Sequence, residues 1–203
     1  MIIDKNIPIL TISISDNDLS QHYKNLSNAS FDRFGYSNHY HIEGPTKFRN
    51  ELNFTDFRTY KNGTSRDWSE SEKCIWVAHC RAWVQVCGLN EVCIIKEHDC
   101  IMTRPFNKHI NYPLFSFAAT TKKRPYSCAA VGYIINPEYA RKLIDFTNTG
   151  NIHVPVDGII HNAEPWVESG HLSKDYVMEN VYARHFIDSS LGAVKVPIRR
   201  KRR

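Results

Sequence analysis

The sequence predicts a single α/β domain in which helices flank a mainly parallel central sheet. A capped helical segment is followed by a Gly-Leu-Asn turn and then by a short apolar run at residues 92–95. Two further apolar segments of strand length follow at residues 114–119 and 129–135, and Pro137 begins another helix directly after the second. Alternation of helices with short buried strands is how parallel sheets are built.

The first element is predicted to be a strand at residues 7–14, where apolar and small polar residues alternate. Residues 15–66 contain many Asn, Ser and aromatic residues with weak periodicity, and Asn62-Gly63 is typical of a turn. Residues 15–66 are therefore the part of the chain whose elements the sequence indicates least clearly.

The clearest element is the helix that follows. Ser69 and Glu72 fit a capping box, and Gly88 stands where a C-terminal cap is expected. Residues 74–87 are apolar on most faces, which predicts a helix packed on both sides.

Two acidic residues follow the next predicted strand. Residues 92–95 are apolar and mostly β-branched, as in a buried strand of a parallel sheet, and Glu97 and Asp99 come directly after them. Ligands collect beyond the carboxyl ends of such strands, and alternate residues point the same way. Paired carboxylates there suit a divalent cation that carries a diphosphate, although a strand ending in a solvated acidic turn has the same pattern.

The later elements follow the same alternation. Residues 114–119 and 129–135 are predicted strands, and a helix is expected at residues 138–146 after Pro137. Residues 154–160 then place Asp157 at a turn before an apolar segment.

The chain is expected to have one domain, residues 1–198, and a basic tail, residues 199–203. Its 203 residues carry a net charge of +5, and the last five residues are all Arg or Lys. Without them, 21 basic side chains balance 21 acidic ones. Such a tail can hold a polyanion such as nucleic acid, anionic lipid headgroups or an acidic glycan, or it can be a solvated end.

Composition excludes two classes of protein. No apolar run approaches the ~18 residues of a membrane span, and the first residues lack a signal-peptide layout. A cytoplasmic location is expected. Five of the six cysteines lie between Cys74 and Cys100 without a C-x-x-C pair, which favours buried thiols over a zinc site.

Four short motifs, in this order, resemble family 25 glycosyltransferases, the lipooligosaccharide-synthesis type that includes collagen galactosyltransferases. The resemblance covers roughly residues 70–160. The matching motifs are Ala78-His79 with Trp83, Glu97-His98-Asp99, Gly132-Tyr133 with Ala140, and Pro155-Val156-Asp157.

The chain departs from the family pattern at three places. Ala78 stands where the family usually has Ser, and His98 replaces the middle acid of its acidic motif. The Asn-Leu-x-Arg type start after the first strand is also missing. Contacts to the donor base cannot be carried over, and metal binding would depend on the two outer acids.

The resemblance implies a GT-A-like fold, a nucleotide-sugar donor, and Mn²⁺ or Mg²⁺. Asp99 would hold the cation, and Glu97 would lie near the ribose or the metal. His79 would orient the donor diphosphate or position a carboxylate, and Asp157 would be the general base. A core role for His79 and a turn or N-cap role for Asp157 remain equally open.

The acceptor and the competing functions are left open by the sequence. The resemblance favours a sugar on a surface glycan. The tail also suits a viral or phage enzyme, in the host cytoplasm, that adds a hexose or pentose to a hydroxylated base in DNA. Such a base would be flipped out and stacked on Trp68, Tyr126 or Trp166. The alternatives are a catalytically inactive GT-A-like binding module and a zinc-stabilised nucleic-acid binder.

Overall fold

A computed structural model describes residues 3–50, 58–61, 64–106, 113–119, 130–148, 156, 160 and 183–185. These residues form a mixed α/β structure, which confirms the predicted class. The elements are β1 (Ile9–Ser13), α1 (Asp18–Asp32), β2 (His39–Glu43), β3 (Arg58–Lys61), β4 (Thr64–Asp67), α2 (Glu70–Leu89), β5 (Cys93–Glu97), β6 (Cys100–Met102), β7 (Leu114–Ser116), β8 (Ala118–Ala119), β9 (Gly132–Ile135), α3 (Pro137–Asn148) and β10 (Ala183–His185).

The main sheet has five strands in the order β2-β1-β5-β9-β7. β1 pairs in parallel with both β2 and β5, whereas β9 is antiparallel to its neighbours β5 and β7. Four strands therefore run in one direction and β9 runs against them. Two of the four strand pairs are parallel and two are antiparallel, so the sheet is mixed, and the prediction of parallel pairing is confirmed for β2, β1 and β5 alone among the described strands.

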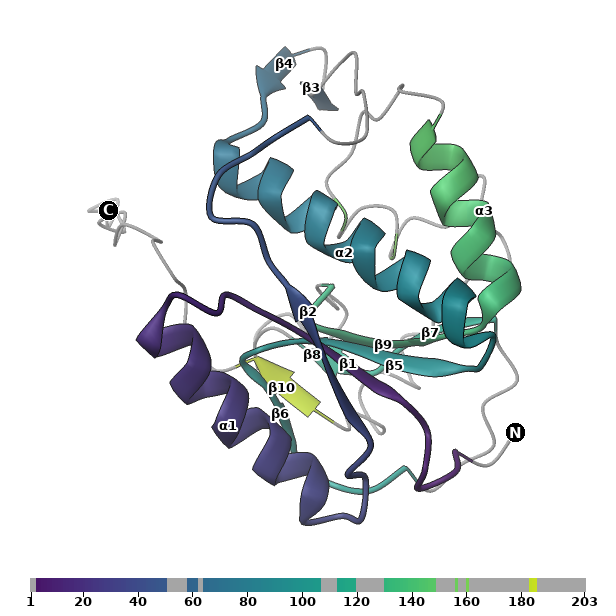
Figure 1. Ribbon diagram of the computed structural model, residues 1–203. Coiled ribbons are helices and arrows are strands. Elements are labelled where there is room, and N and C mark those ends of the chain that lie inside the picture. Colours follow the sequence, from purple (N-terminus) through teal and green to yellow (C-terminus); the bar gives the residue numbers. More distant parts are fainter. Residues whose placement is uncertain are drawn as a thin grey trace, which may run out of the picture.

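Helices cover both faces of the sheet (Figure 1). Helix α1 lies on one face, and α2 and α3 lie side by side on the other. Alternate strand residues enter two separate core clusters, as the two-residue period of a strand requires. The α2–α3 side takes Leu10, Ile12, Cys93, Ile95, Tyr133 and Ile135, and the α1 side takes Ile9, Ile94 and Ile134.

Helix α2 begins as predicted and ends later. Glu72 N–H donates to Ser69 Oγ at 3.2 Å, and Ser69 N–H donates to Glu72 Oε2 at 2.9 Å, which confirms the capping box. The predicted cap at Gly88 is wrong, because Gly88 lies inside the helix. Asn90 is the C-cap instead, in the left-handed conformation at φ 54°, which Asn tolerates better than most residues.

The strand predicted at residues 7–14 is confirmed as β1, but the next segment was missed. Residues 15–66 contain α1, β2, β3 and the start of β4. The buried residues of α1 are Ser20, Tyr23, Ser27 and Phe31. Half of this face is serine, so the apolar period of the helix is weak. Residues Asn62 and Gly63 lie outside the described residues, between the paired strands β3 and β4.

The remaining predicted elements are found with changed limits. Residues 114–119 divide into β7 and β8, which belong to different sheets. Helix α3 begins at Pro137, and the Asn136 side chain caps it by accepting Tyr139 N–H at 2.8 Å. Val156 and Ile160 are buried in the core cluster of α2 and α3. Asp157 and the tail at 199–203 lie outside the described residues.

In the part of the chain that the structure describes, no helix has the length and apolarity needed to cross a membrane.

Candidate active site

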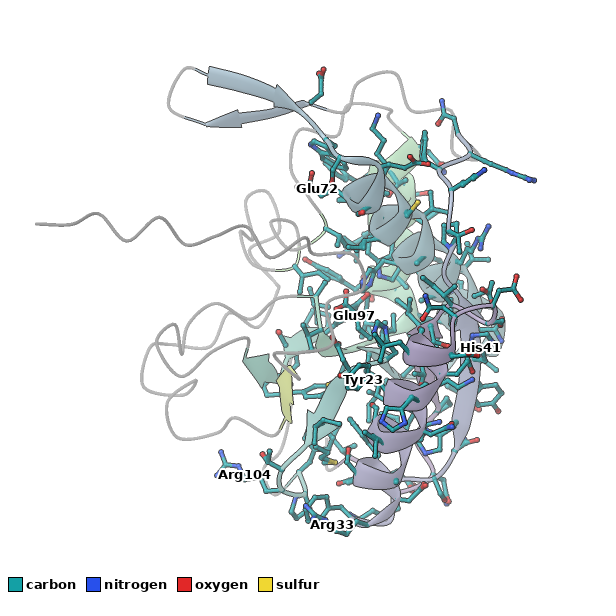
Figure 2. The ribbon with its side chains drawn as sticks, turned by 90° about the vertical axis from the view of Figure 1, so that its left-hand side faces the viewer. Tyr23, Arg33, His41, Glu72, Glu97 and Arg104 are labelled. Atoms are coloured by element: carbon teal, nitrogen blue, oxygen red, sulfur yellow. The ribbon has the colours of Figure 1, made fainter. Side chains whose placement is uncertain are left out.

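The strand order places a topological switch point at the carboxyl ends of β1 and β5. β2 and β5 lie on opposite sides of β1, and α1 and α2, which precede them, cover opposite faces. Ligands of open α/β sheets bind outside the carboxyl ends of the strands at such a switch point. Figure 2 views the molecule from this side, with Glu97 and Tyr23 near the middle of the view.

Glu97 is the last residue of β5 and faces α2. Its backbone N–H donates to Val131 O at 2.9 Å, which ties the strand end to the segment before β9. Its carboxylate Oε1 lies 3.7 Å from His79 Nε2, and its side chain is 21% exposed while that of His79 is 1% exposed. The acid is therefore partly accessible at the end of β5, and the imidazole beside it is enclosed.

His79 belongs to a buried hydrogen-bond network. Its Nδ1 lies 2.8 Å from the Tyr133 hydroxyl, and the Trp83 indole N–H donates to the same hydroxyl at 2.8 Å. The rings of His79 and Tyr133 stack with centroids 5.7 Å apart. Burial raises the pKa of Tyr133 well above its usual value, although the Trp83 hydrogen bond opposes this, so the phenol stays protonated.

The acidic pair does not continue the alternation of the strand. His98 and Asp99 form a turn between β5 and β6. The alternation of a strand therefore does not extend to Asp99, and the prediction that this alternation points both acids to one side is wrong. His98 lies against the Tyr23 ring of α1, with centroids 6.3 Å apart, whereas Glu97 faces α2. The middle position of the motif thus turns away from Glu97.

Asp99 is 2% exposed in this turn. Burial raises the pKa of the Cys100 thiol, and the charges of Asp99 and Glu97 raise it further against the opposing effect of Lys96. The charges of both carboxylates therefore affect the same thiol, that of Cys100. The structure brings His79 and Glu97 together, places Asp99 at the adjoining turn, and leaves Asp157 outside the described residues.

One or two carboxylates are enough to bind a cation that a substrate also coordinates. Within the described ranges, no three or more His, Cys, Asp and Glu side chains form a group able to hold a metal ion. Mg²⁺ is commonly bound by one or two carboxylates together with substrate phosphates and water, so an all-protein cage is not required. Of the two carboxylates at this end of β5, Glu97 is partly exposed and Asp99 is enclosed.

A second polar cluster, which the sequence did not reveal, lies at the ends of β1 and β2. The Glu43 carboxylate accepts hydrogen bonds from the Ser15 hydroxyl and from Ser15 N–H, and His41 Nε2 lies 3.6 Å from it. Arg81 of α2 donates to the Glu43 carbonyl at 2.9 Å. Burial would raise the pKa of Glu43, but the Ser15 bonds, His41 and Arg81 lower it.

The signal for that cluster was present in the chain but ambiguous. His39, His41 and Glu43 alternate in a strand that ends at Gly44-Pro45, yet only Ile42 of this strand is a buried apolar residue. A strand at the sheet edge with polar residues on both faces has no hydrophobic period to detect.

The cysteines behave as buried apolar residues where they are described. Burial raises the pKa of Cys80 and of Cys93 to about 12, so both thiols are protonated at neutral pH. Cys80 and Cys93 lie in the core between the sheet and α2, whereas Cys100 lies in the core beside α1. These three cysteines are split between the two faces of the sheet, so they do not form one zinc site.

Comparison of the sequence with models of known protein families and with curated proteins finds no match. The function is therefore argued below from the residues and geometry of this chain.

Proposed function

We propose that this chain is a metal-dependent glycosyltransferase. It would move a hexose or pentose from a nucleotide sugar to an acceptor hydroxyl, on a surface glycan or on a hydroxylated base of DNA. The observation that carries the proposal is the position of Glu97. Its carboxylate is partly exposed at the carboxyl end of β5, beside the switch point of the sheet, with the enclosed His79 behind it.

The reaction would need stabilisation of a nucleoside diphosphate leaving group. Bound Mn²⁺ or Mg²⁺ would neutralise the negative charge that develops on the diphosphate. Glu97 and Asp99 would bind this cation, and His79 would orient Glu97. Asp157 would accept the proton of the acceptor hydroxyl as the new bond to the anomeric carbon forms and the bond to the diphosphate breaks.

The direct test is a panel of nucleotide sugars screened for Mn²⁺-dependent hydrolysis. We expect one donor to be hydrolysed, and we expect Glu97→Gln and Asp99→Asn to lower kcat by about 100-fold or more, as for loss of a group that stabilises the transition state. Glu91→Gln is the matched control, because Glu91 is exposed at the opposite end of β5 and should not affect the rate. Full activity in Glu97→Gln, or no hydrolysis of any donor, would contradict the proposal.

The acceptor is tested separately by sugar transfer. With the donor identified, hydroxymethylated DNA and a set of oligosaccharides are compared at low salt, where binding to the DNA backbone is strongest. Transfer to only one of them identifies the acceptor class, and absence of transfer to DNA under these conditions excludes a DNA acceptor.

An inactive binding module is the second candidate, favoured by the position of His98. It replaces an acid of the family motif and lies against Tyr23 instead of beside Glu97. Such a module would bind the nucleotide sugar in calorimetry with the same affinity in the presence and absence of Mn²⁺, and it would show no turnover.

A further inference from the structure

The two hydrogen bonds of the Tyr133 hydroxyl have a defined donor and acceptor. The indole N–H of Trp83 is a donor only, so in its 2.8 Å contact the Tyr133 oxygen accepts. The remaining partner of this hydroxyl among the described residues is His79 Nδ1, also at 2.8 Å. The Tyr133 O–H therefore donates to Nδ1, since Tyr133 is fully buried and the raised pKa keeps its proton in place.

The direction of that bond determines which nitrogen of His79 carries hydrogen. A neutral imidazole has one donor and one acceptor nitrogen, so an accepting Nδ1 leaves the hydrogen on Nε2. Nε2 is buried and has no hydrogen-bond partner among the residues that the structure describes, and Glu97 Oε1 lies 3.7 Å from it. In the opposite tautomer, Tyr133 would accept two bonds and its own buried O–H would have no acceptor in the described part of the chain.

We infer that Trp83 and Tyr133 are positioning residues that hold His79 in its Nε2–H tautomer. In this tautomer the hydrogen on Nε2 is the polar hydrogen of the ring nearest Glu97, and Nε2 has no lone pair for a cation. His79 thus orients a carboxylate and is not itself a metal ligand. The consequence for catalysis rests on the proposed function, whereas the tautomer does not.

The tautomer can be measured directly by ¹⁵N NMR of the histidine rings in the full chain. In the spectrum of the neutral ring, we expect His79 to show an unprotonated Nδ1 and a protonated Nε2. The signals are assigned by their loss in His79→Gln. A protonated Nδ1 in the unmodified chain would overturn the inference.

Removal of the tyrosine hydroxyl tests the cause. Tyr133→Phe should convert His79 to a mixture of tautomers. Tyr36→Phe is the matched control, because Tyr36 is also fully buried and lies in the other core cluster, and within the described ranges its hydroxyl has no hydrogen-bond partner. An unchanged His79 tautomer in Tyr133→Phe would show that Tyr133 does not set it.

Two substitutions of His79 separate orientation of Glu97 from a merely structural role. The amide nitrogen of Gln can replace Nε2, and that of Asn can replace Nδ1. We expect Mn²⁺-dependent donor hydrolysis to stay within about tenfold in His79→Gln and to fall about 100-fold in kcat in His79→Asn, the range found for residues that orient metal ligands. Thermal melting identifies any loss of fold.

The reverse order of the two variants would overturn the inference. If the unmodified chain hydrolyses no donor, the proposed function fails, and the NMR measurement still decides the tautomer. The two failures are therefore distinguishable.

Discussion

Lys96 shows how one residue joins two layers of the molecule. Its side chain is fully buried, and its Nζ donates to Ser27 Oγ at 2.6 Å and to Asn28 Oδ1 at 2.8 Å. Nζ also lies 5.1 Å from the centre of the Phe31 ring. Burial lowers the pKa of Lys96 to about 7, although the charges of Asp32 and Asp99 oppose this. The residue fastens α1 to the strand that carries Glu97.

Residue-scale chemistry also predicts a pH dependence of stability at His39. Burial lowers the pKa of His39 below 6.5, although Asp32, 2.9 Å from Nε2, raises it. The unfolded state therefore binds more protons than the folded state as pH falls through 6.5, so the free energy of unfolding decreases there. This loss is absent above 6.5 and complete below the folded pKa.

We expect His39→Gln to lose less stability than the unmodified chain between about pH 7.5 and about pH 5, with a difference of about 1 kcal/mol or less. Urea denaturation at both pH values measures it. His22→Gln, at an exposed histidine, should follow the unmodified chain. An equal loss of stability in all three proteins would contradict the assignment to His39.

Two glycines should respond in opposite directions to substitution by alanine. A Cβ on Gly88 would have no heavy atom within 4 Å, whereas a Cβ on Gly132 would lie 2.9 Å from Cys100 Sγ and 2.9 Å from a Phe117 ring atom. Gly88→Ala should raise the free energy of unfolding by about 0.4–1 kcal/mol, because alanine has fewer conformations than glycine in the unfolded chain and is favoured inside a helix.

Gly132→Ala should destabilise by about 1–3 kcal/mol through overpacking. The midpoints of urea unfolding of both variants test the pair. A stabilised Gly132→Ala variant would mean that β9 and β6 do not pack as closely as described.

At the scale of elements, the predictable helices are those whose signals are local. The starts of α2 and α3 depend on the N-terminal caps Ser69 and Asn136, which bond to residues three positions further along the chain. Helix α1 was missed because its buried face contains Ser20 and Ser27 while Leu19 and Leu26 are 44% and 43% exposed. Ser27 is buried because it accepts from Lys96 and donates to Cys100 O, contacts about 70 residues away in the chain.

The capping box of α2 gives a prediction at this scale. Ser69→Ala should lower the free energy of unfolding by about 0.5–2 kcal/mol, because Glu72 N–H loses its acceptor. Chemical denaturation followed by circular dichroism measures the loss. Ser71→Ala, at an exposed serine in the first turn of the same helix, should change stability little. Equal effects of the two substitutions would show that the cap contributes nothing.

At the scale of the whole molecule, the net positive charge lies at one end of the sequence. Residues 1–198 carry no net charge and the last five residues are all basic, so we expect any attraction of a polyanion by net charge to depend on these five residues. The candidate site contributes carboxylates instead, which favour a cation and repel phosphate until the cation is bound.

Deletion of residues 199–203 should therefore leave thermal stability unchanged and weaken binding of hydroxymethylated DNA. The slope of log K against log salt should become less steep by up to about 4.5, near 0.9 for each lost phosphate contact. A variant with these five residues changed to Gln should behave in the same way. If binding and its salt dependence are unaffected, the tail does not contact DNA.

The candidate site was only partly predictable. Glu97 was recognisable because an apolar run of strand length ends just before it, and the α/β class followed from the alternation of such runs with capped helices. The second polar cluster, formed by Ser15, His41 and Glu43, was not recognisable in the sequence. Polar residues of an edge strand and a loop have no period that distinguishes them from a solvated surface.

By itself, the sequence determined the start of α2 and the strand β5 with Glu97 at its end, because these depend on contacts between residues a few positions apart. Only the tertiary structure decided that β9 runs antiparallel and that His98 turns toward α1. It also decided that Tyr133 meets His79, 54 residues away. These depend on how helices pack on a sheet, and the same apolar pattern is buried equally well in parallel or antiparallel pairing.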